Sequence, residues 1–402
     1  MKVDRDLITT ETKLVQDFEG GQLYRVGTLD IAVLNGTYKE MGRQYGSLVK
    51  DKILSTRDSW KKVFIDSGIL SFESILEVIG IPFYTSSPKK LKDLYQGISE
   101  TSGISLHEAV VLDNWLSLVV TGRRAGCSCY MGWGDKTIDG SLYMGRNLDF
   151  PEFARDLFAA NGVVAVLNPI GGEFSVAGIG TAGTIASFDD AMNSEGLSVN
   201  VLNGVGSIQP VLYSNRVSLI SFLGDSLASY STIEELKILF NTTKPGYPGL
   251  ISVGQPDKGV HFEVSPETYI AEESPDQFSV RANQFNYPGW GIPQLPGATG
   301  WFSMTRQEAW LKAIEATKTT KIDEHVLMEA MNAPMWNSDG TLTGTGFTVF
   351  EHGQIGSAGG DEGADVTMLQ VISQPAERKW WIRVPTHTGW MEIDLKKYFK
   401  RT

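Results

Sequence analysis

The chain has 402 residues, of which 42% are hydrophobic and 20% are charged, and its formal net charge is −12. This hydrophobic content supports a substantial core and excludes a largely disordered chain. The excess of acidic residues argues against a nucleic-acid partner, because affinity for phosphate backbones comes from clustered Lys and Arg. Two cysteines in so long a chain exclude a disulfide framework.

Membrane insertion is also disfavoured by the sequence. No stretch reaches the roughly 18 uninterrupted apolar residues that a transmembrane helix needs. The first residues, Met1 to Asp6, are mostly charged and do not form a signal peptide. We therefore expect no membrane span and a cytoplasmic location.

The first third of the chain has the pattern of one hairpin followed by helices. Residues 22–34 alternate apolar and polar around Gly27-Thr28, which predicts the hairpin. Each expected helix is bounded by a capping residue or a proline. These helices cover 36–49, 71–80, 89–99 and 106–120, and a polar linker at 121–125 follows the last of them.

The strongest candidate for chemistry is the pair Gly126-Cys127, which the second cysteine, Cys129, follows two residues later. A thiol attacks as thiolate, and because its ordinary pKa is ~8.5 it needs a base or a positive neighbour. An N-terminal cysteine carries its own base, since an α-amino group has a pKa of about 7.7–8.0. We therefore predict that the chain cuts its own Gly126–Cys127 bond through a thioester that water opens. A glycine before the cut tolerates strained backbone and close approach.

A predicted hairpin returns two charged residues to this cysteine. Strands are expected over 130–134 and 141–145, and Asp139-Gly140 between them is a strong signal for a tight hairpin turn. Arg146 then lies near the thiol, where it can lower the thiol pKa and hold a substrate carbonyl. Asp149 can accept a hydrogen bond from the new α-amine.

The run GCSCYMGWGDKTIDGSLYMGRNLDF resembles the N-terminal-nucleophile hydrolases of the choloylglycine hydrolase superfamily. More closely, it resembles their self-processing penicillin acyltransferase-like branch, which includes isopenicillin N acyltransferase. Cys129 stands where that branch usually has Ser or Thr, so Cys129 is the alternative nucleophile. Cys127 is preferred because Gly126 precedes it and Asp139 follows it at the spacing expected of this branch.

After residue 150 the pattern alternates between strands and helices. The expected strands cover 162–167, 174–179, 197–202, 251–254, 259–264, 268–271, 346–351, 366–372, 379–384 and 390–394. The expected helices cover 214–229, 231–241 with Ser231 as cap, 301–316 and 323–332. Between them, residues 288–300 are rich in Gly and Pro and predict a long loop that could act as a lid.

The resemblance implies three further site residues. Asn203 follows the turn at 191–197 and stands where the family has a residue of the oxyanion hole. Asn283 stands where the family has an asparagine that donates its side-chain amide to the oxyanion, with Asn286 as the neighbouring alternative. Arg306 stands where the superfamily carries a second active-site arginine. From the residues alone, the asparagines could equally be turn residues and the arginine a surface residue of a helix.

The resemblance also implies an α+β chain with a four-layer α/β/β/α sandwich, the fold of the N-terminal-nucleophile hydrolases. Residues 1–126 would become a separate, mainly helical fragment on self-cleavage, and residues 127–402 would form the catalytic fragment of one structural unit. The implied activity is cleavage of a linear, non-peptide amide of a small molecule with an apolar acyl group. Water or an amine would resolve the thioester, so acyl transfer is the second option. No cofactor or metal is implied, and a homo-oligomer is compatible.

Two other classes of protein stay open. One is a thiol hydrolase that is never cut, in which the thiol could pair with His261 or His387. The other is a catalytically inactive binding protein on the same fold. The five histidines lack the spacing of a zinc site. The glycine-rich runs at 178–183 and 353–363 lack the fingerprints of dinucleotide and phosphate loops.

Overall fold

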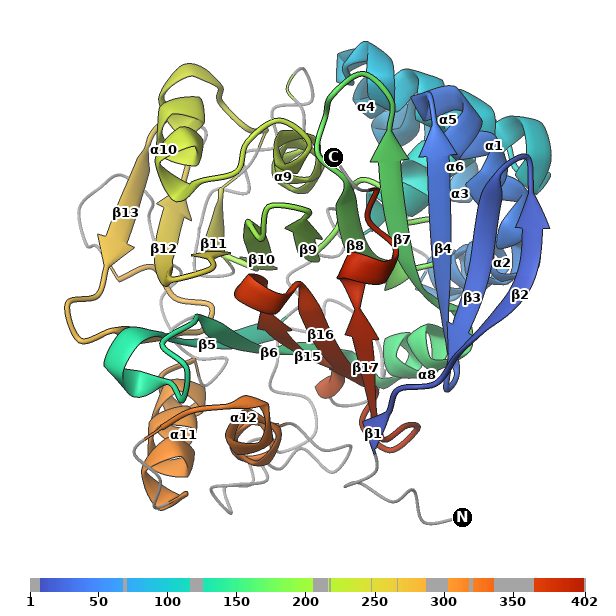
Figure 1. Ribbon diagram of the computed structural model, residues 1–402. Helices are drawn as coiled ribbons and strands as arrows, with labels where there is room; N and C mark the ends of the chain where they lie inside the picture. The colour runs from blue at the N-terminus through green and yellow to red at the C-terminus, as the bar shows by residue number, and fades with distance from the viewer. Residues whose placement is uncertain are drawn as a thin grey trace.

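The computed structural model has a mixed helix-and-sheet fold built on two sheets, which agrees with the expected α+β class (Figure 1). The residues that it describes are 8–67, 71–115, 126–204, 216, 218–246, 248–265, 267–286, 303–317, 321–335 and 365–400.

The larger sheet has ten strands, and its order joins the first part of the chain to the middle. In spatial order the strands are β13 (Tyr269–Glu273), β12 (Lys258–Val264), β11 (Gly249–Gln255), β10 (Ser198–Leu202), β9 (Asp190–Asn193), β8 (Val176–Thr181), β7 (Gly162–Pro169), β4 (Leu29–Gly36), β3 (Gly21–Val26) and β2 (Thr12–Phe18). Strands β4 and β7 pair in parallel and every other neighbouring pair is antiparallel.

The smaller sheet has seven strands and carries the Gly126-Cys127 pair. In spatial order the strands are β1 (Ile8–Thr9), β17 (Trp390–Asp394), β16 (Lys379–Arg383), β15 (Asp365–Gln374), β6 (Tyr143–Pro151), β5 (Gly126–Gly132) and β14 (Phe278–Arg281). Strand β5 therefore lies between β6 and β14, and both neighbours run antiparallel to it.

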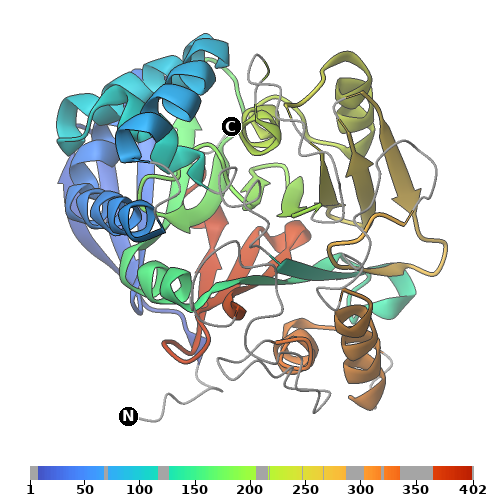
Figure 2. The ribbon, with the colours of Figure 1, turned by 180° about the vertical axis from the view of Figure 1, so that it is seen from behind.

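Helices lie against both sheets. In chain order they are α1 (Tyr38–Leu48), α2 (Lys50–Ser67), α3 (Phe72–Ile75), a π-helical segment (Leu76–Gly80), α4 (Ile81–Ser86), α5 (Lys89–Ser102), α6 (Leu106–Asp113), α8 (Glu152–Asn161), α9 (Leu219–Leu227), α10 (Ile233–Thr242), α11 (Ser303–Ala316) and α12 (Glu324–Ala330). Figure 2 shows the N-terminal helices stacked on the larger sheet at β4 and β7. Both views place α11 and α12 below β5 and β6 of the smaller sheet. None of these helices is long and apolar enough to cross a membrane.

Two glycines allow the closest helix contact of the N-terminal region. A Cβ added at Gly42 of α1 would lie 2.1 Å from the carbonyl oxygen of Leu94, and one at Gly97 of α5 would lie 2.2 Å from that of Lys39. Any larger residue would separate α1 from α5. The helix α1 begins at Thr37, which is its N-cap and forms a capping box with Glu40.

The alternation of side chains along β5 decides which residues face the larger sheet. Cys127, Cys129 and Met131 belong to the main core between the sheets. Tyr130 points to the other face, where it packs in a second core with Trp310 of α11. Met131 reaches the larger sheet, since its Sδ lies 2.8 Å from a Cβ built on Gly259 of β12. Cys127 is thus held in the interior, between the two sheets.

Most of the predicted strands and helices are confirmed, with differences at their ends. The first error in the predicted secondary structure concerns the turn at Asp139-Gly140. It does not join β5 directly to β6, because residues 133–142 form a longer connection with a short 3₁₀ helix at Gly134–Lys136. The carboxylate of Asp139 accepts a 2.9 Å hydrogen bond from the Ser141 N–H and makes a local turn inside that connection.

Two predicted helix boundaries were wrong. Thr232, with an extended backbone, caps α10 in place of Ser231, and its capping-box partner is Glu235. Pro82 does not interrupt the helical path, because it lies in the first turn of α4, where a missing N–H is tolerated.

Other differences concern elements that the sequence did not predict: β1, β2, β9, β14, α2, α4 and α8. The helix α9 begins at Leu219 with Ser218 as its cap, and residues 214, 215 and 217 of the predicted helix lie outside the described residues. The predicted helix beyond residue 115, the linker at 121–125, the loop at 288–300 and the strand at 346–351 lie outside the described residues.

Candidate active site

Cys127 is the second residue of β5 and its side chain is buried, with 2% of the residue exposed. In the register of the sheet it lies opposite Leu148 of β6. Cys129 follows on the same face, and both thiols are free. Two of the predicted partners of Cys127, Arg146 and Asp149, lie on β6, which supports the expectation that the returning strand would bring them near.

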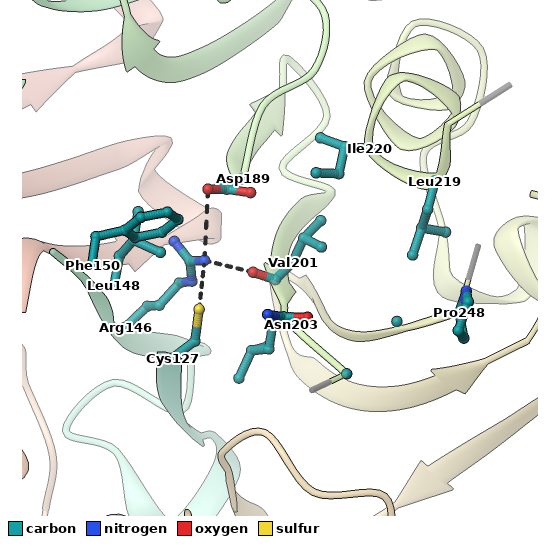
Figure 3. A pocket seen from close by; sticks show the side chains of 13 residues that line it. Cys127, Arg146, Leu148, Phe150, Asp189, Val201, Asn203, Leu219, Ile220 and Pro248 are labelled. Atoms are coloured by element: carbon teal, nitrogen blue, oxygen red, sulfur yellow. Dashed lines mark hydrogen bonds and ion pairs between the residues drawn. The ribbon is translucent and has the colours of Figure 1, made fainter. Parts of the chain in front are cut away.

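The guanidinium of Arg146 is buried and contacts the sulphur of Cys127 (Figure 3). Its Nη2 donates to the Cys127 Sγ at 3.2 Å and to the main-chain oxygen of Val201 at 2.5 Å. Its Nη1 donates to Asp190 Oδ2 at 2.6 Å. Three groups, from β5, β9 and β10, are thereby joined at this one cation of β6.

Two consecutive carboxylates accompany Arg146, and neither was predicted from the sequence. Asp190, the first residue of β9, also accepts a hydrogen bond from the side chain of Asn200. Asp189 has its Oδ2 4.0 Å from Arg146 Nη2. Burial raises the pKa of Asp189 to about 7, and the nearby Asp190 adds to the effect of burial against the pull of Arg146. The sequence does show two adjacent acidic residues at the start of a strand. It does not indicate their partner, because Arg146 lies more than forty positions earlier in the chain.

A second set of contacts surrounds the main chain of Cys127. Asn283, just after β14, accepts a 2.7 Å hydrogen bond from the Cys127 N–H through Oδ1. Arg306, in the first turns of α11, donates to the Cys127 carbonyl oxygen at 2.5 Å and to Asn283 Oδ1 at 2.8 Å. The Asn283 Nδ2 donates to the main-chain oxygen of Asn203 at 2.7 Å. The structure therefore brings all the asparagines and arginines of the predicted site to Cys127.

Asp149 lies opposite Gly126 in the sheet register. Its Oδ2 lies 3.2 Å from Arg306 Nη1, and its Oδ1 accepts a 2.7 Å hydrogen bond from Thr367 of β15. Burial raises the pKa of Asp149 to about 6, against the opposing effects of Arg306 and Thr367. In the uncut chain, then, the Cys127 N–H is held by the Asn283 amide oxygen and not by the Asp149 carboxylate.

The position of Gly126 leaves room for a small side chain. A Cβ built there would lie 3.5 Å from Asp149 Oδ2 and 3.6 Å from Arg306 Nη1, which are ordinary contact distances. The requirement for glycine before Cys127 is therefore not a matter of space in this conformation. A Cβ at this position would lie beside the Asp149 carboxylate and the Arg306 guanidinium, which flank the Gly126–Cys127 peptide bond.

The thiol of Cys127 is not activated in the uncut chain. Burial raises its pKa to about 11, and the nearby Asp189 and Asp149 carboxylates act in the same direction. Arg146 and a hydrogen bond from the Asn203 backbone oppose this rise without cancelling it. The thiol is consequently protonated at neutral pH in the uncut chain.

A pocket opens beside the Cys127 sulphur and has mainly apolar walls (Figure 3). Its polar members are Cys127, Arg146, Asp189 and Asn203. The apolar and glycine members are Leu148, Phe150, Val201, Leu202, Gly204, Leu219, Ile220, Pro248 and Gly249. The sulphur thus faces a space suited to an apolar group with a few polar contacts at one end.

The alternative pairings do not form around Cys127 among the described residues. His261 Nδ1 lies 2.8 Å from Ser252 Oγ, and His387 Nε2 lies 3.3 Å from Asp156. Asn286 uses its backbone N–H to bond Glu263 Oε1 at 2.6 Å and is exposed. No group of three or more His, Cys, Asp or Glu in the described ranges is arranged to hold a metal ion.

No family model and no curated protein matches the chain. Solved structures that align with it include two variants of conjugated bile acid hydrolase from Clostridium perfringens, with TM-scores of 0.45 and 0.44 and identities of 16% and 15%. Each alignment covers 67% of this chain and 93% of the other. Penicillin V acylase from Agrobacterium tumefaciens aligns with a TM-score of 0.36 and 12% identity, over 67% of this chain and 87% of the other.

Proposed function

We propose that this chain is a cysteine N-terminal-nucleophile hydrolase that cuts itself before Cys127 and then cleaves linear amides of small molecules. One observation carries the proposal: both reacting atoms of Cys127 are already held. Asn283 binds its nitrogen at 2.7 Å, and Arg146 lies 3.2 Å from its sulphur. A merely structural cysteine in a core also needs an acceptor for its N–H, but it does not need a buried guanidinium at its sulphur.

The first step is self-cleavage. The Cys127 sulphur attacks the carbonyl carbon of Gly126, and the thiol proton passes to the amide nitrogen as the carbon–nitrogen bond breaks. The product is a thioester between Gly126 and the Cys127 sulphur, with the Cys127 α-amine free. Water then opens the thioester and leaves a carboxylate on Gly126. Arg306 and Asn283 support this step because they fix the main chain of Cys127 on either side of its Cα.

The new α-amine supplies a base next to the thiol for the reaction with the substrate. Its ordinary pKa of about 7.7–8.0 is near neutral pH, whereas the buried thiol in the uncut chain has a pKa of about 11. The amine takes the thiol proton as the sulphur attacks the substrate carbonyl, and it returns the proton to the leaving amine. Asn283 Oδ1 orients the amine, and Asp149 acts through Arg306, which contacts both Asn283 and Asp149.

The tetrahedral oxyanion needs hydrogen-bond donors aimed at the place where charge develops. The Asn203 backbone N–H, which bonds the Cys127 sulphur, and the side-chain amide of Asn283 are the donors that we assign to it. The thioester that follows is opened by water to give a carboxylic acid. An amine in place of water would give acyl transfer.

The proposal includes the architecture and the fragments. In Figures 1 and 2 a layer of helices, the larger sheet, the smaller sheet and a second layer of helices follow one another, and we assign this arrangement to the four-layer sandwich of the N-terminal-nucleophile hydrolases. Residues 1–126 and 127–402 become two polypeptides of one structural unit. The acyl part of the substrate occupies the apolar pocket beside Cys127.

The test is an intact-mass spectrum of the purified chain, repeated over days at neutral pH. We expect two fragments, with the larger one beginning at Cys127, and one uncut chain for Cys127→Ala. Cys129→Ser is the matched control, because it changes a cysteine on the same face of β5 and should be cut as the parent is. A fragment that begins at Cys129 would move the nucleophile by two residues.

The same samples separate the two other classes of protein. An uncut parent chain that hydrolyses amides in a Cys127-dependent manner would establish a thiol hydrolase without processing. An uncut parent chain that neither hydrolyses amides nor reacts with acylating thiol probes would contradict the proposal and favour a binding protein.

A further inference from the structure

Asp189 has a carboxylate oxygen without a partner beside the reacting sulphur. Its residue is 8% exposed, and its Oδ1 is buried without a hydrogen-bond partner among the described residues. Its Oδ2 lies 4.0 Å from Arg146 Nη2, the one ion pair that Asp189 makes with the described residues. A buried carboxylate oxygen left in this state costs free energy, so native structures normally satisfy such oxygens. The proposed mechanism uses no atom of Asp189.

When all the carboxylates are ionised, the charges buried around Cys127 do not balance. Arg146 and Arg306 supply two positive charges, and the carboxylates of Asp149, Asp189 and Asp190 supply up to three negative ones. Arg146 is paired with Asp190 at 2.6 Å, and Arg306 lies 3.2 Å from Asp149. Asp189 is therefore the excess carboxylate. Formation of the Cys127 thiolate would add a further negative charge, which makes the imbalance worse at the moment of attack.

The position of Asp189 points to the acyl side of a bound amide. It lines the same pocket as the Cys127 sulphur, and Figure 3 shows its second oxygen directed toward the side of the pocket where Ile220 lies. Arg146 lies between Asp189 and the sulphur. Asp189 is the one carboxylate among the residues that line this pocket, so a cation on an acyl group bound here would meet it. The rest of the wall here, including Leu219 and Ile220, is apolar.

We infer that Asp189 binds a protonated amine on the acyl group of the substrate, so that the preferred substrates are amides of amino acids with a free α-amine and an apolar side chain. A cation at this place satisfies the free oxygen, cancels the excess charge and lowers the cost of forming the thiolate beside Asp189. The apolar wall takes the side chain. This inference rests on the proposed function, since it assigns the acyl group to this pocket.

The substrates that test the inference are two anilides with one carbon skeleton. Leucine p-nitroanilide carries the α-amine, and 4-methylpentanoic acid p-nitroanilide is the same molecule without it. Release of p-nitroaniline is followed at neutral pH with the processed parent, Asp189→Asn and Asp257→Asn. Asp257→Asn is the matched control, because that carboxylate is exposed in the turn between β11 and β12.

We expect the parent and Asp257→Asn to cleave the leucine anilide with a kcat/KM at least about tenfold higher than that for the anilide without the amine. A gain of this size is expected from a charge-assisted hydrogen bond. Asp189→Asn should lose about 10- to 100-fold on the leucine anilide and keep or improve its rate on the anilide without the amine. Equal losses on both substrates would assign Asp189 a structural role and overturn the inference. The preference of the parent alone also decides the matter if Asp189→Asn fails to fold.

Failure of the inference and failure of the proposed function give different results. If the anilide without the amine is cleaved as fast or faster in a Cys127-dependent reaction, the proposed function stands and the inference falls. If the parent cleaves neither anilide and remains uncut, the proposed function fails and takes the inference with it. Binding can also be measured without turnover, as the change in melting temperature of Cys127→Ala when isopentylamine or isopentanol is added. We expect a shift with the amine only, and we expect Asp189→Asn in this background to abolish it.

Discussion

Arg146 contacts Cys127 and at the same time depends on Asp190 for its own burial. Its Nη2 lies 3.2 Å from the sulphur and its Nη1 2.6 Å from the carboxylate, and both charged side chains are 1% exposed. Removing one member of a buried ion pair leaves the other charge without a partner, which costs more than the pair contributes. The cation beside the nucleophile is therefore also a structural element of the site.

Replacing Arg146 should damage stability and reactivity by separate routes. We expect Arg146→Met to lose roughly 3–5 kcal/mol of unfolding free energy, because Asp190 is left buried and unpaired. The double variant Arg146→Met/Asp190→Asn should recover much of that loss. Reaction of Cys127 with an alkylating probe should stay slowed by at least about tenfold in both, because the positive charge that lowers the thiol pKa is gone. Urea unfolding and labelling rates measure the two effects, and full recovery of labelling in the double variant would contradict this role of Arg146.

Two substitutions at Asn283 distinguish its oxygen from its amide group. Asn283→Asp keeps an acceptor for the Cys127 N–H and for Arg306, but it loses the donor. We expect it to stay folded and to cleave amides about 10²–10³ times more slowly, which is typical for loss of an oxyanion donor. Asn283→Leu loses both ends and should in addition cost about 1–3 kcal/mol, because a buried N–H and a guanidinium lose their acceptor. Equal kcat values for Asn283→Asp and the parent would remove Asn283 from the oxyanion hole.

The buried carboxylate of Asp149 should make the stability of the protein fall as pH rises. Its pKa is raised from 3.8 to about 6, so the native state favours the protonated form. The stability that this provides is fully present below pH 3.8 and is lost as pH rises through about 6. We expect the difference in unfolding free energy between the parent and Asp149→Asn to change by roughly 2 kcal/mol from pH 4 to pH 7, in favour of the variant at the higher pH. Urea titrations at four pH values measure it, and parallel pH curves for the two proteins would be the contrary result.

How far the sequence predicts the site depends on the distance along the chain between partners. Cys127, Arg146 and Asp149 lie on one hairpin, so strand alternation and a local motif were enough to place them together. Asp190 meets Arg146 from another sheet, and Thr367 reaches Asp149 across more than two hundred residues. Nothing local to Asp190 or Thr367 indicates those contacts, because they arise only when the two sheets and β15 pack.

The errors in secondary structure have a similar origin. The Asp139-Gly140 pair has the chemistry of a tight turn and does make one, but tertiary contacts widen the connection around it. The Trp133 N–H bonds the Gln277 oxygen and the Ile138 N–H bonds the Ile322 oxygen, so residues 133–142 are held by segments far away in sequence. Turn propensity therefore locates the bend correctly and fails to give its length.

The contact between Ser128 and Trp310 should stabilise the helix that carries Arg306. Trp310 Nε1 donates to Ser128 Oγ at 3.0 Å on the face of β5 opposite Cys127. We expect Ser128→Ala to cost about 1–3 kcal/mol because the buried indole N–H loses its acceptor. Ser128→Ala/Trp310→Phe should cost less than the sum of the two single changes, because both polar groups are then gone. The double-mutant cycle in urea measures this coupling, and additive losses would mean that the hydrogen bond contributes nothing.

Both sheets take strands from the segment that precedes Cys127. Strand β4 pairs in parallel with β7, and β1 pairs with β17 near the end of the chain. A cut at Gly126–Cys127 would therefore give two polypeptides that are interlocked, and neither could leave without breaking a sheet. The order of events follows: the chain folds first as one molecule and is cut afterwards. Once the two fragments have been separated, they could form the mature structure again only by pairing strands of both sheets in a reaction between two molecules.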